Sequence, residues 1–268
     1  MLIVVPVSRT DEILINSFAE VFNMQGPYEK HELLVVYRPA DKDWAENVYY
    51  QIAIKNNKFQ KSAMKEFSGD GPRGWPSGPN FYWEQTVAHL KEIKNRKPWL
   101  WMELDMTPLK SGWADKLYKE YKNCGKPFMG NLGDTTTLTG DGKLIRLCKH
   151  LVGAAVYPPS LDKYSKIWKH VSGINTAWDI LCQWEFTPLA HESKLMQFCF
   201  RTQNYKRKQS IKDKNKKIVI GEDNNGFKDY RFDHPIDFEN AVIVHGCNDG
   251  SLNKLLIKEA KEKAGEDL

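Results

Sequence analysis

The chain has 268 residues, of which 41% are hydrophobic and 27% are charged, and its formal net charge is +5. This composition predicts a globular protein with one sizeable core and excludes a disordered chain. No apolar stretch has the length of a membrane span, and the apolar start is too short for a signal peptide. We therefore expect a soluble, cytoplasmic protein with no membrane partner. The five cysteines lack CxxC spacing, which indicates neither a zinc site nor a disulfide framework.

The first half of the chain alternates strand and helix patterns. Strands are expected at residues 2–7 and 32–37, and helices at 11–22 and 42–54. A loop rich in glycine and proline follows at 68–80, where its composition argues against regular structure. A helix predicted at 81–94 then leads into the next strand.

The second half continues the alternation. Strands are expected at 126–130, 151–157 and 241–244, and helices at 161–170 and 176–186. Strands that alternate with helices favour right-handed crossovers within one sheet. The sequence thus predicts an α/β domain whose mostly parallel central sheet is flanked by helices, with ligands beyond the carboxyl ends of the strands.

The apolar run at 99–102 ends in Glu103-Leu104-Asp105. Two acids one residue apart on a strand project to the same side, and such a pair at a strand's carboxyl end suits a hard divalent cation. Acid-x-acid triplets also occur by chance. A buried strand, however, does not tolerate two unpartnered carboxylates, so the context favours a site for Mn²⁺ or Mg²⁺ at Glu103 and Asp105.

A second polar group follows the late apolar run, where His245 precedes Gly246. A histidine in this position is either a hydrogen-bonded structural residue or a metal ligand. Mg²⁺ and Mn²⁺ accept an imidazole together with carboxylates. Combined with the acid pair, His245 is expected to be the third ligand, and Gly246 would let the backbone approach a phosphate.

The order of these features resembles the glycosyltransferases of the GT-A fold: a strand tip at 6–9, the Gly/Pro loop, Glu103-Leu104-Asp105, and His245-Gly246. The segments 74–80 and 153–158 are also similar to glycosyltransferase-like proteins of bacteriophages. In the GT-A family a DxD-type motif binds the metal of a nucleotide-diphosphate sugar, and many members add a late histidine. This sequence departs from the pattern in having Glu103 as the first acid and no lysine shortly after the histidine.

The resemblance implies a single GT-A, Rossmann-like catalytic domain over 1–268. Its nucleotide-sugar-binding half would be 1–130 and its acceptor-binding half 131–268. The implied activity is that of a hexosyltransferase, with a UDP-sugar donor such as UDP-glucose and Mn²⁺ or Mg²⁺.

By the same resemblance, one set of residues would contact the nucleotide sugar: Pro6, Val7, Ser8, Arg9, Trp75, Asn80, Glu103, Leu104, Asp105 and Gly246. Arg9 would be available to a phosphate. Ser8 equally suits the cap of the helix that follows, and Asn80 suits a cap as well as a donor contact. Trp75 either stacks on a ring or packs beneath its loop.

Asp179 is the candidate catalytic residue, with Glu185 as the alternative. Asp179 would deprotonate the acceptor hydroxyl or stabilise the developing oxocarbenium charge. An acid in the first turn of a helix is also favoured by the helix dipole, so a purely structural role is open as well.

The segment 201–217 carries eight basic residues against one acid, Asp213. It is either a solvated loop or a grip on the phosphate backbone of a polyanion. With the phage resemblance, the second reading points to glucosylation of hydroxymethylated bases in double-stranded DNA, with the base flipped out, in the host cytoplasm if the protein is viral. Three alternatives stay open: transfer to a glycan or a protein, a Mg²⁺-dependent nucleotidyltransferase, and a non-catalytic nucleic-acid-binding protein.

Overall fold

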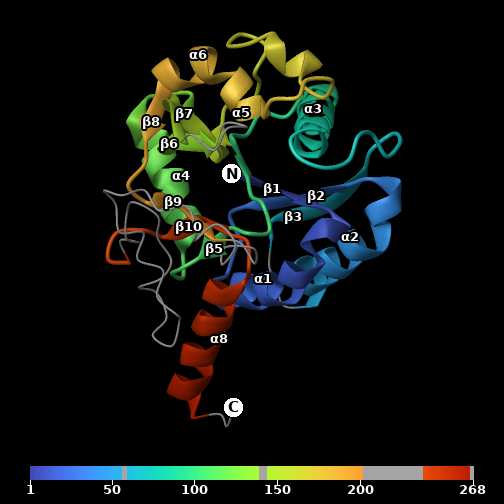
Figure 1. Cartoon of the computed structure of the whole chain (residues 1–268). Coiled ribbons are helices and arrows are strands. Elements are labelled where there is room, and N and C mark those ends of the chain that lie inside the picture. The colour runs from blue at the N-terminus through green and yellow to red at the C-terminus, as the bar shows by residue number, and fades with distance from the viewer. Residues whose placement is uncertain (56–58, 139–143, 202–237, 266–268) are drawn as a thin grey trace.

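A seven-stranded sheet with the order β3-β2-β1-β4-β7-β6-β8 forms the centre of the computed structural model (Figure 1). The structure describes residues 1–55, 59–138, 144–201 and 238–265. The strands of this sheet are β1 (Leu2–Val7), β2 (Glu32–Tyr37), β3 (Lys61–Glu66), β4 (Trp99–Trp101), β6 (Phe128–Leu138), β7 (Leu144–Tyr157) and β8 (Ala190–Glu192).

The first four strands of the sheet are parallel to one another, which confirms the predicted architecture. Strand β7, however, runs antiparallel to both β4 and β6. Parallel neighbours need a long crossover, usually a helix, and the sequence from 126 to 157 contains no helical pattern. The two strands expected at 126–130 and 151–157 are therefore parts of longer antiparallel neighbours. Strand β3 was not predicted.

The helices are α1 (Glu12–Met24), α2 (Lys42–Tyr49), α3 (Ser77–Glu92), α4 (Trp113–Cys124), α5 (Trp178–Leu181), α6 (Gln183–Phe186) and α8 (Ser251–Ala264). Short 3-10 turns lie at Arg9–Asp11, Pro39–Asp41, Ile167–His170 and Thr187–Leu189, and a π-helical segment at Tyr50–Lys55 extends α2. None of the helices in the described residues is both long and apolar enough to cross a bilayer.

Three predicted elements were wrong in part. The expected loop 68–80 ends earlier, because Pro79 lies in the first turn of α3, where a missing N–H costs no helical hydrogen bond. The expected helix 161–170 is only the turn Ile167–His170, and the Ser165 hydroxyl accepts the Ile167 N–H instead of leaving it to a helix. The expected helix 176–186 is broken at Cys182 into α5 and α6.

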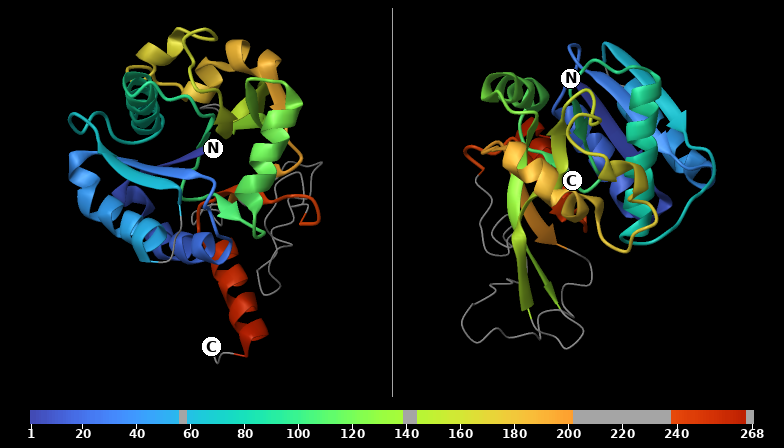
Figure 2. Two further views of the ribbon diagram at one scale, coloured as in Figure 1. Left: turned by 180° about the vertical axis from the view of Figure 1, so that it is seen from behind. Right: turned by 90° about the horizontal axis from the view of Figure 1, so that it is seen from above.

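Alternating side chains of β1 pack into two separate cores. Ile3 and Val5 belong to a cluster that includes Phe18 of α1 and Trp113 of α4. Leu2 and Val4 belong to the cluster on the other face, which includes Trp83 of α3. Figure 2 shows the helices on both faces of the sheet. Burying each large apolar side chain stabilises the fold by roughly 1.5–3 kcal/mol, so this double-sided burial fixes the strand register and brings the strand ends to one edge.

A second, three-stranded sheet has the order β5-β10-β9. Its strands are β5 (Thr107–Pro108), β9 (Met196–Arg201) and β10 (Ile243–Cys247). The strand expected at 241–244 therefore begins later, contains His245, and belongs to this small sheet instead of the central one. Because Val244 pairs with Thr107 in antiparallel register, β10 lies directly beside the chain that follows β4.

Candidate metal and nucleotide site

The acid pair after β4 and the histidine of β10 meet in space. Nε2 of His245 lies 3.1 Å from Oε2 of Glu103 and 3.4 Å from Oδ1 of Asp105. One ligand atom from each of the three residues lies within 4.8 Å of the others. The structure thus brings together the three residues that the sequence predicted as metal ligands. We call them the metal triad.

One backbone and one side-chain hydrogen bond hold the triad in place. The N–H of Cys247 donates to the carbonyl oxygen of Asp105 at 3.1 Å, and the indole Nε1 of Trp101 donates to Oε1 of Glu103 at 2.9 Å. Gly246 has a φ of +98° at a bulge between His245 and Cys247. This left-handed backbone favours glycine and turns the strand immediately after the histidine.

The electrostatics of the triad suit a cation. Burial raises the pKa of Asp105 to about 6, against the attraction of His245 and with the Glu103 carboxylate adding to the rise. Burial would also raise the pKa of Glu103, but hydrogen bonds to His245 and Trp101 hold that pKa below its ordinary value. Oδ1 of Asp105 is buried and accepts no hydrogen bond from the described residues. Such an oxygen, beside a second carboxylate and an imidazole, fits a hard divalent ion such as Mg²⁺ or Mn²⁺.

Asp11 is a further acid of this site that sequence reasoning missed. Burial raises its pKa to about 7, and the charges of Asp105, Glu103 and Asp41 add to the rise. Asp11 thus lies close enough to the metal triad to interact with it. The sequence carries no separate signal for this role, because an acid at the start of α1 has an ordinary structural explanation.

Most of the residues at 6–9 that were expected to contact the nucleotide sugar have structural roles instead. Pro6 is half-buried within β1, and the Val7 side chain is fully buried in the core, so it does not face a nucleotide. Oγ of Ser8 accepts the N–H of Thr10 at 3.4 Å and caps the turn Arg9–Asp11, as the structural alternative predicts. The side chain of Arg9 is exposed and remains available to a ligand.

Asn80 is fully buried and joins α3 to the segment before α5. Its Nδ2 donates to carbonyl oxygens and its Oδ1 accepts a backbone N–H, the partners being Val171, Ile174, Thr176 and Trp178. These bonds are 2.8–3.1 Å long. Both functions of the amide are therefore occupied, which corrects the expectation that Asn80 contacts the donor. The residue is not a helix cap either, because α3 begins at Ser77.

Two other predicted contacts also differ from expectation. The Leu104 side chain is 2% exposed and packs into the core, so it does not contact a donor. Trp75 is 77% exposed and does not pack beneath its loop. An indole that lies so open on the surface is available for stacking.

Asp179 and Glu185 lie on α5 and α6, and the described part of the structure does not place them among the metal ligands. Oδ2 of Asp179 accepts the N–H of Gly153 at 3.1 Å and lies 3.7 Å from Nε2 of His150. Burial raises the pKa of Tyr157, and the charges of both Asp179 and Glu103 contribute. Tyr157 therefore lies within electrostatic range of both Asp179 and Glu103.

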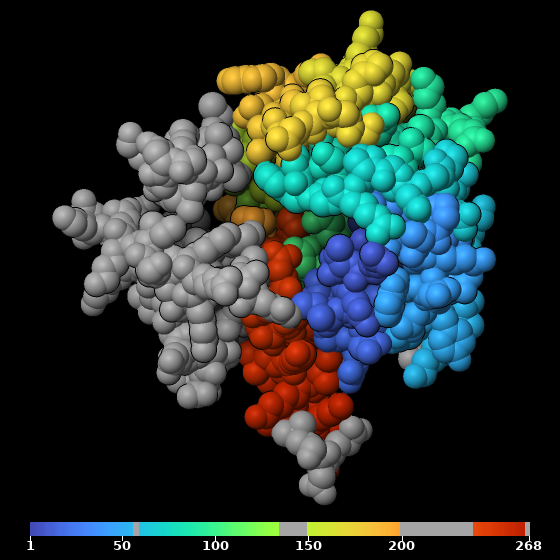
Figure 3. Space-filling model, turned by 45° about the vertical axis from the view of Figure 1, so that its right-hand side comes forward, coloured from blue at the N-terminus to red at the C-terminus, as the bar shows by residue number. Residues whose placement is uncertain are grey.

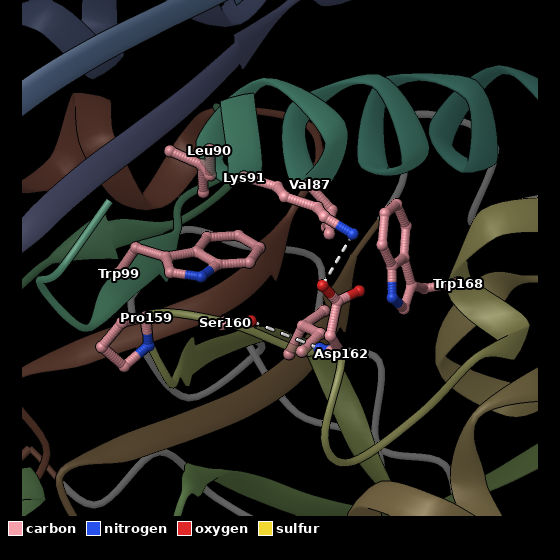
Figure 4. A pocket seen from close by; sticks show the side chains of 9 residues that line it. Val87, Leu90, Lys91, Trp99, Pro159, Ser160, Asp162 and Trp168 are labelled. Atoms are coloured by element: carbon pink, nitrogen blue, oxygen red, sulfur yellow. Dashed lines mark hydrogen bonds and ion pairs between the residues drawn. The ribbon is translucent and has the colours of Figure 1, made fainter. Parts of the chain in front are cut away.

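The surface is hollowed beside the segment that carries the acid pair. Figure 3 shows dark green surface, from the chain following β4, recessed between the blue N-terminal part, the teal region of α3 and the red C-terminal part. A different cavity, of about 10 Å³, lies between α3 and the segment after β7, where Lys91 Nζ and Asp162 Oδ2 are 2.7 Å apart (Figure 4). That cavity holds at most about one water molecule, so it is not a nucleotide site.

The basic segment predicted at 201–217 lies outside the described residues, except for Arg201 at the end of β9.

Comparisons with known proteins bear on the fold. No protein-family model matches the sequence, and no curated protein sequence matches it significantly. Two solved structures, each 11% identical to the chain, are similar to it with a TM-score of 0.51: mouse xyloside xylosyltransferase 1 in its apo form, and an active-site mutant of LgtC. The first match covers 92% of this chain and 98% of the other, and the second covers 98% and 96%.

A further LgtC structure, described as a galactosyltransferase in complex with donor and acceptor sugar analogs, has a TM-score of 0.49 and the same identity of 11%. At such low identity the likeness establishes the fold alone. The chain has the mixed α/β architecture of the GT-A glycosyltransferases, as the sequence predicted.

Proposed function

We propose that this protein is a metal-dependent glycosyltransferase that moves a sugar from a nucleotide-diphosphate sugar to an acceptor hydroxyl. The observation that carries the proposal is the meeting of Glu103, Asp105 and His245 at the carboxyl end of β4. Ligands of open α/β sheets bind at this edge. The GT-A fold of the similar structures gives the sheet edge a precedent for nucleotide-sugar chemistry.

Glu103, Asp105 and His245 would hold Mn²⁺ or Mg²⁺, whose positive charge would stabilise the negative charge of the departing diphosphate. The indole of Trp101 fixes the orientation of the Glu103 carboxylate through a hydrogen bond. The exposed guanidinium of Arg9 would contact a phosphate of the donor. The donor-binding contacts would lie mostly in the half 1–130, although His245 comes from the half 131–268.

Asp179 would act on the acceptor side, either as the base for its hydroxyl or as a charge that stabilises the oxocarbenium ion. Two backbone N–H groups, of Gly153 and Ile180, fix the two carboxylate oxygens of Asp179. Glu185 is the alternative, since its Oε2 is buried and has no hydrogen-bond partner among the described residues.

The donor and the acceptor follow from the sequence resemblance. We propose a UDP-sugar such as UDP-glucose as the donor. Hydroxymethylated bases of double-stranded phage DNA are the acceptor to test first, because the basic segment 201–217 would suit a polyanion. A glycan and a protein are the other acceptors to test.

A screen of nucleotide sugars by thermal shift, with and without Mn²⁺, tests the proposal. Binding to the folded chain alone raises the unfolding midpoint, so one nucleotide should give a rise that needs the metal. Asp105→Asn should lose that rise, whereas Asp43→Asn, which changes an exposed acid on α2, should keep it. Release of a nucleoside diphosphate supports transfer, and release of pyrophosphate would replace the proposal with a nucleotidyltransferase.

A further inference from the structure

Arg38 is a buried cation that has no anionic partner among the described residues. It follows β2 and is only 5% exposed. Its guanidinium carbon lies 4.7 Å from the ring centroid of Tyr82 and 5.5 Å from that of Phe81. Nε has no hydrogen-bond partner, and no ion pair joins the guanidinium to a carboxylate among the described residues. Buried charges are normally paired, so this one indicates a missing partner.

The acid nearest to Arg38 in sequence is already occupied. Asp41 uses Oδ2 to accept the hydroxyl of Tyr82 at 2.8 Å and Oδ1 to accept the N–H of Arg9 at 3.2 Å. Asp70, on the loop after β3, accepts the N–H of Ala40 at 3.0 Å. Neither carboxylate forms an ion pair with the guanidinium in the described part of the chain.

The first turn of α3 lies beside the guanidinium. A Cβ atom on Gly78, the second residue of α3, would be 3.1 Å from Nη2 of Arg38. Glycine at this position leaves the guanidinium room to approach the helix. The N-terminus of a helix carries partial positive charge, and this 16-residue helix has no acid in its first turn and no side-chain cap. Two positive groups thus face each other without a counter-charge from the described residues.

The first turn also has an unused donor. The N–H groups of Gly78 and Asn80 donate to the carbonyl oxygens of Gly74 and Pro76, and Pro79 has no N–H. The N–H of Ser77 has no backbone partner within the described residues. An amide at a helix N-terminus together with a guanidinium is a donor set that suits an oxyanion, above all a phosphate.

We propose that Arg38 and the first turn of α3 bind a phosphate group at a site separate from the metal triad. Arg38 follows β2, whereas the triad follows β4, and β1 lies between these strands. Two strand spacings are about 10 Å, so one phosphoryl group cannot reach both sites. The phosphate is either free or carried by a nucleotide that extends along the sheet edge.

The test uses the full chain in phosphate-free buffer with EDTA, which separates it from the metal-dependent proposal. Inorganic phosphate is titrated while the melting temperature is measured, with chloride holding the ionic strength constant. We expect a rise of about 3–5 °C at ten times the Kd. Arg38→Met should lose this rise and, without phosphate, should melt no lower than the wild type because an unpaired buried charge is gone. Arg96→Met, an exposed arginine beyond the other end of α3, should respond like the wild type.

Two further variants keep the proposal testable if Arg38→Met does not fold. Gly78→Ala, whose Cβ would crowd Nη2, should weaken phosphate binding, and Arg38→Lys should retain part of it. If a nucleoside diphosphate raises the melting temperature at a lower concentration than inorganic phosphate does, and only with Arg38 present, the bound phosphate belongs to a nucleotide. If both raise it at the same concentration, the ligand is the free phosphate ion. No response of the wild type, or an equal response of Arg38→Met, would overturn the proposal.

Discussion

His245 Nε2 lies 3.1 Å from Glu103 Oε2, although the two residues are 142 positions apart in the chain. The contact joins the three-stranded sheet to the end of β4 in the central sheet. A cation bound here would connect both sheets. Metal binding should therefore stabilise the folded chain as well as complete the site.

Replacing His245 by glutamine should weaken Mn²⁺ binding by roughly 10- to 100-fold or more, because one of three ligands is lost. Isothermal titration calorimetry measures the change. The matched control is His191→Gln. His191 lies on β8, outside the triad, and its Nε2 is 3.3 Å from Oε1 of Glu120. Equal Mn²⁺ affinity of the His245 variant and the wild type would remove His245 from the ligand set.

Asp179→Asn should lower kcat for sugar transfer by about 10²- to 10⁴-fold, the range expected for loss of an acid-base group. Its affinity for Mn²⁺ should not change, because Asp179 is not part of the triad. The comparison with Glu185→Gln decides between the two candidates. A fall in kcat for the Glu185 variant alone would transfer the catalytic role to that residue.

The stability of the metal-free protein should depend on pH through Asp11. Its pKa rises from 3.8 to about 7 on folding, because of burial and then of the neighbouring acids. Between these two values the unfolded chain is ionised while the folded chain keeps its proton, so stability falls as pH rises through this window and levels off above about 7. The upper limit is about 1.4 kcal/mol for each unit of pKa shift.

Asp11→Asn cannot ionise and should melt at a higher temperature than the wild type near pH 8 in EDTA. The difference should shrink as the pH falls and vanish near pH 3, about a unit below the unfolded pKa of 3.8, where Asp11 is mostly protonated in both the folded and the unfolded chain. Calorimetric melting curves across this range measure the effect. A difference that stays constant with pH would mean that ionisation of Asp11 is not its cause.

Asn80→Ala should destabilise the fold by about 2–4 kcal/mol, because it removes four side-chain hydrogen bonds, of which those to the Val171 carbonyl and the Trp178 N–H are buried. Urea unfolding measures the loss. Asn95→Ala serves as the control, since Asn95 bonds only locally to Lys97 beyond the end of α3, and should cost less. If the variant kept wild-type stability but lost donor affinity, Asn80 would be a donor contact after all.

The sequence predicted the parts of this protein whose signals are local. The strands β1 and β2 and the run before Glu103 are short and apolar, and burial on both faces explains both the pattern and the position. The acid pair and His245 could be recognised because their residue types suit one cation. The sequence could not show that His245 lies within β10, because pairing with Thr107 depends on contacts between distant segments.

For other residues the sequence alone is compatible with more than one role. An asparagine such as Asn80 can cap a helix, contact a ligand or hydrogen-bond buried backbone groups. Only the fold shows that its amide bonds to the backbone of the segment 171–178. Asp11 has an ordinary place at a helix start, which hides its proximity to Asp105. Arg38 has no motif at all, since the lack of a hydrogen-bond partner for its Nε among the described residues is a property of the packed structure.

The order in which the ribosome makes the chain has a consequence for this protein. Glu103 and Asp105 are synthesised long before β10, so a nascent polypeptide holds the two acids of the metal triad but not its histidine. Only when β10 pairs with β5 does the third ligand arrive. Tight capture of a divalent ion would therefore require this pairing, and the ion would hold the later-made strand in its place.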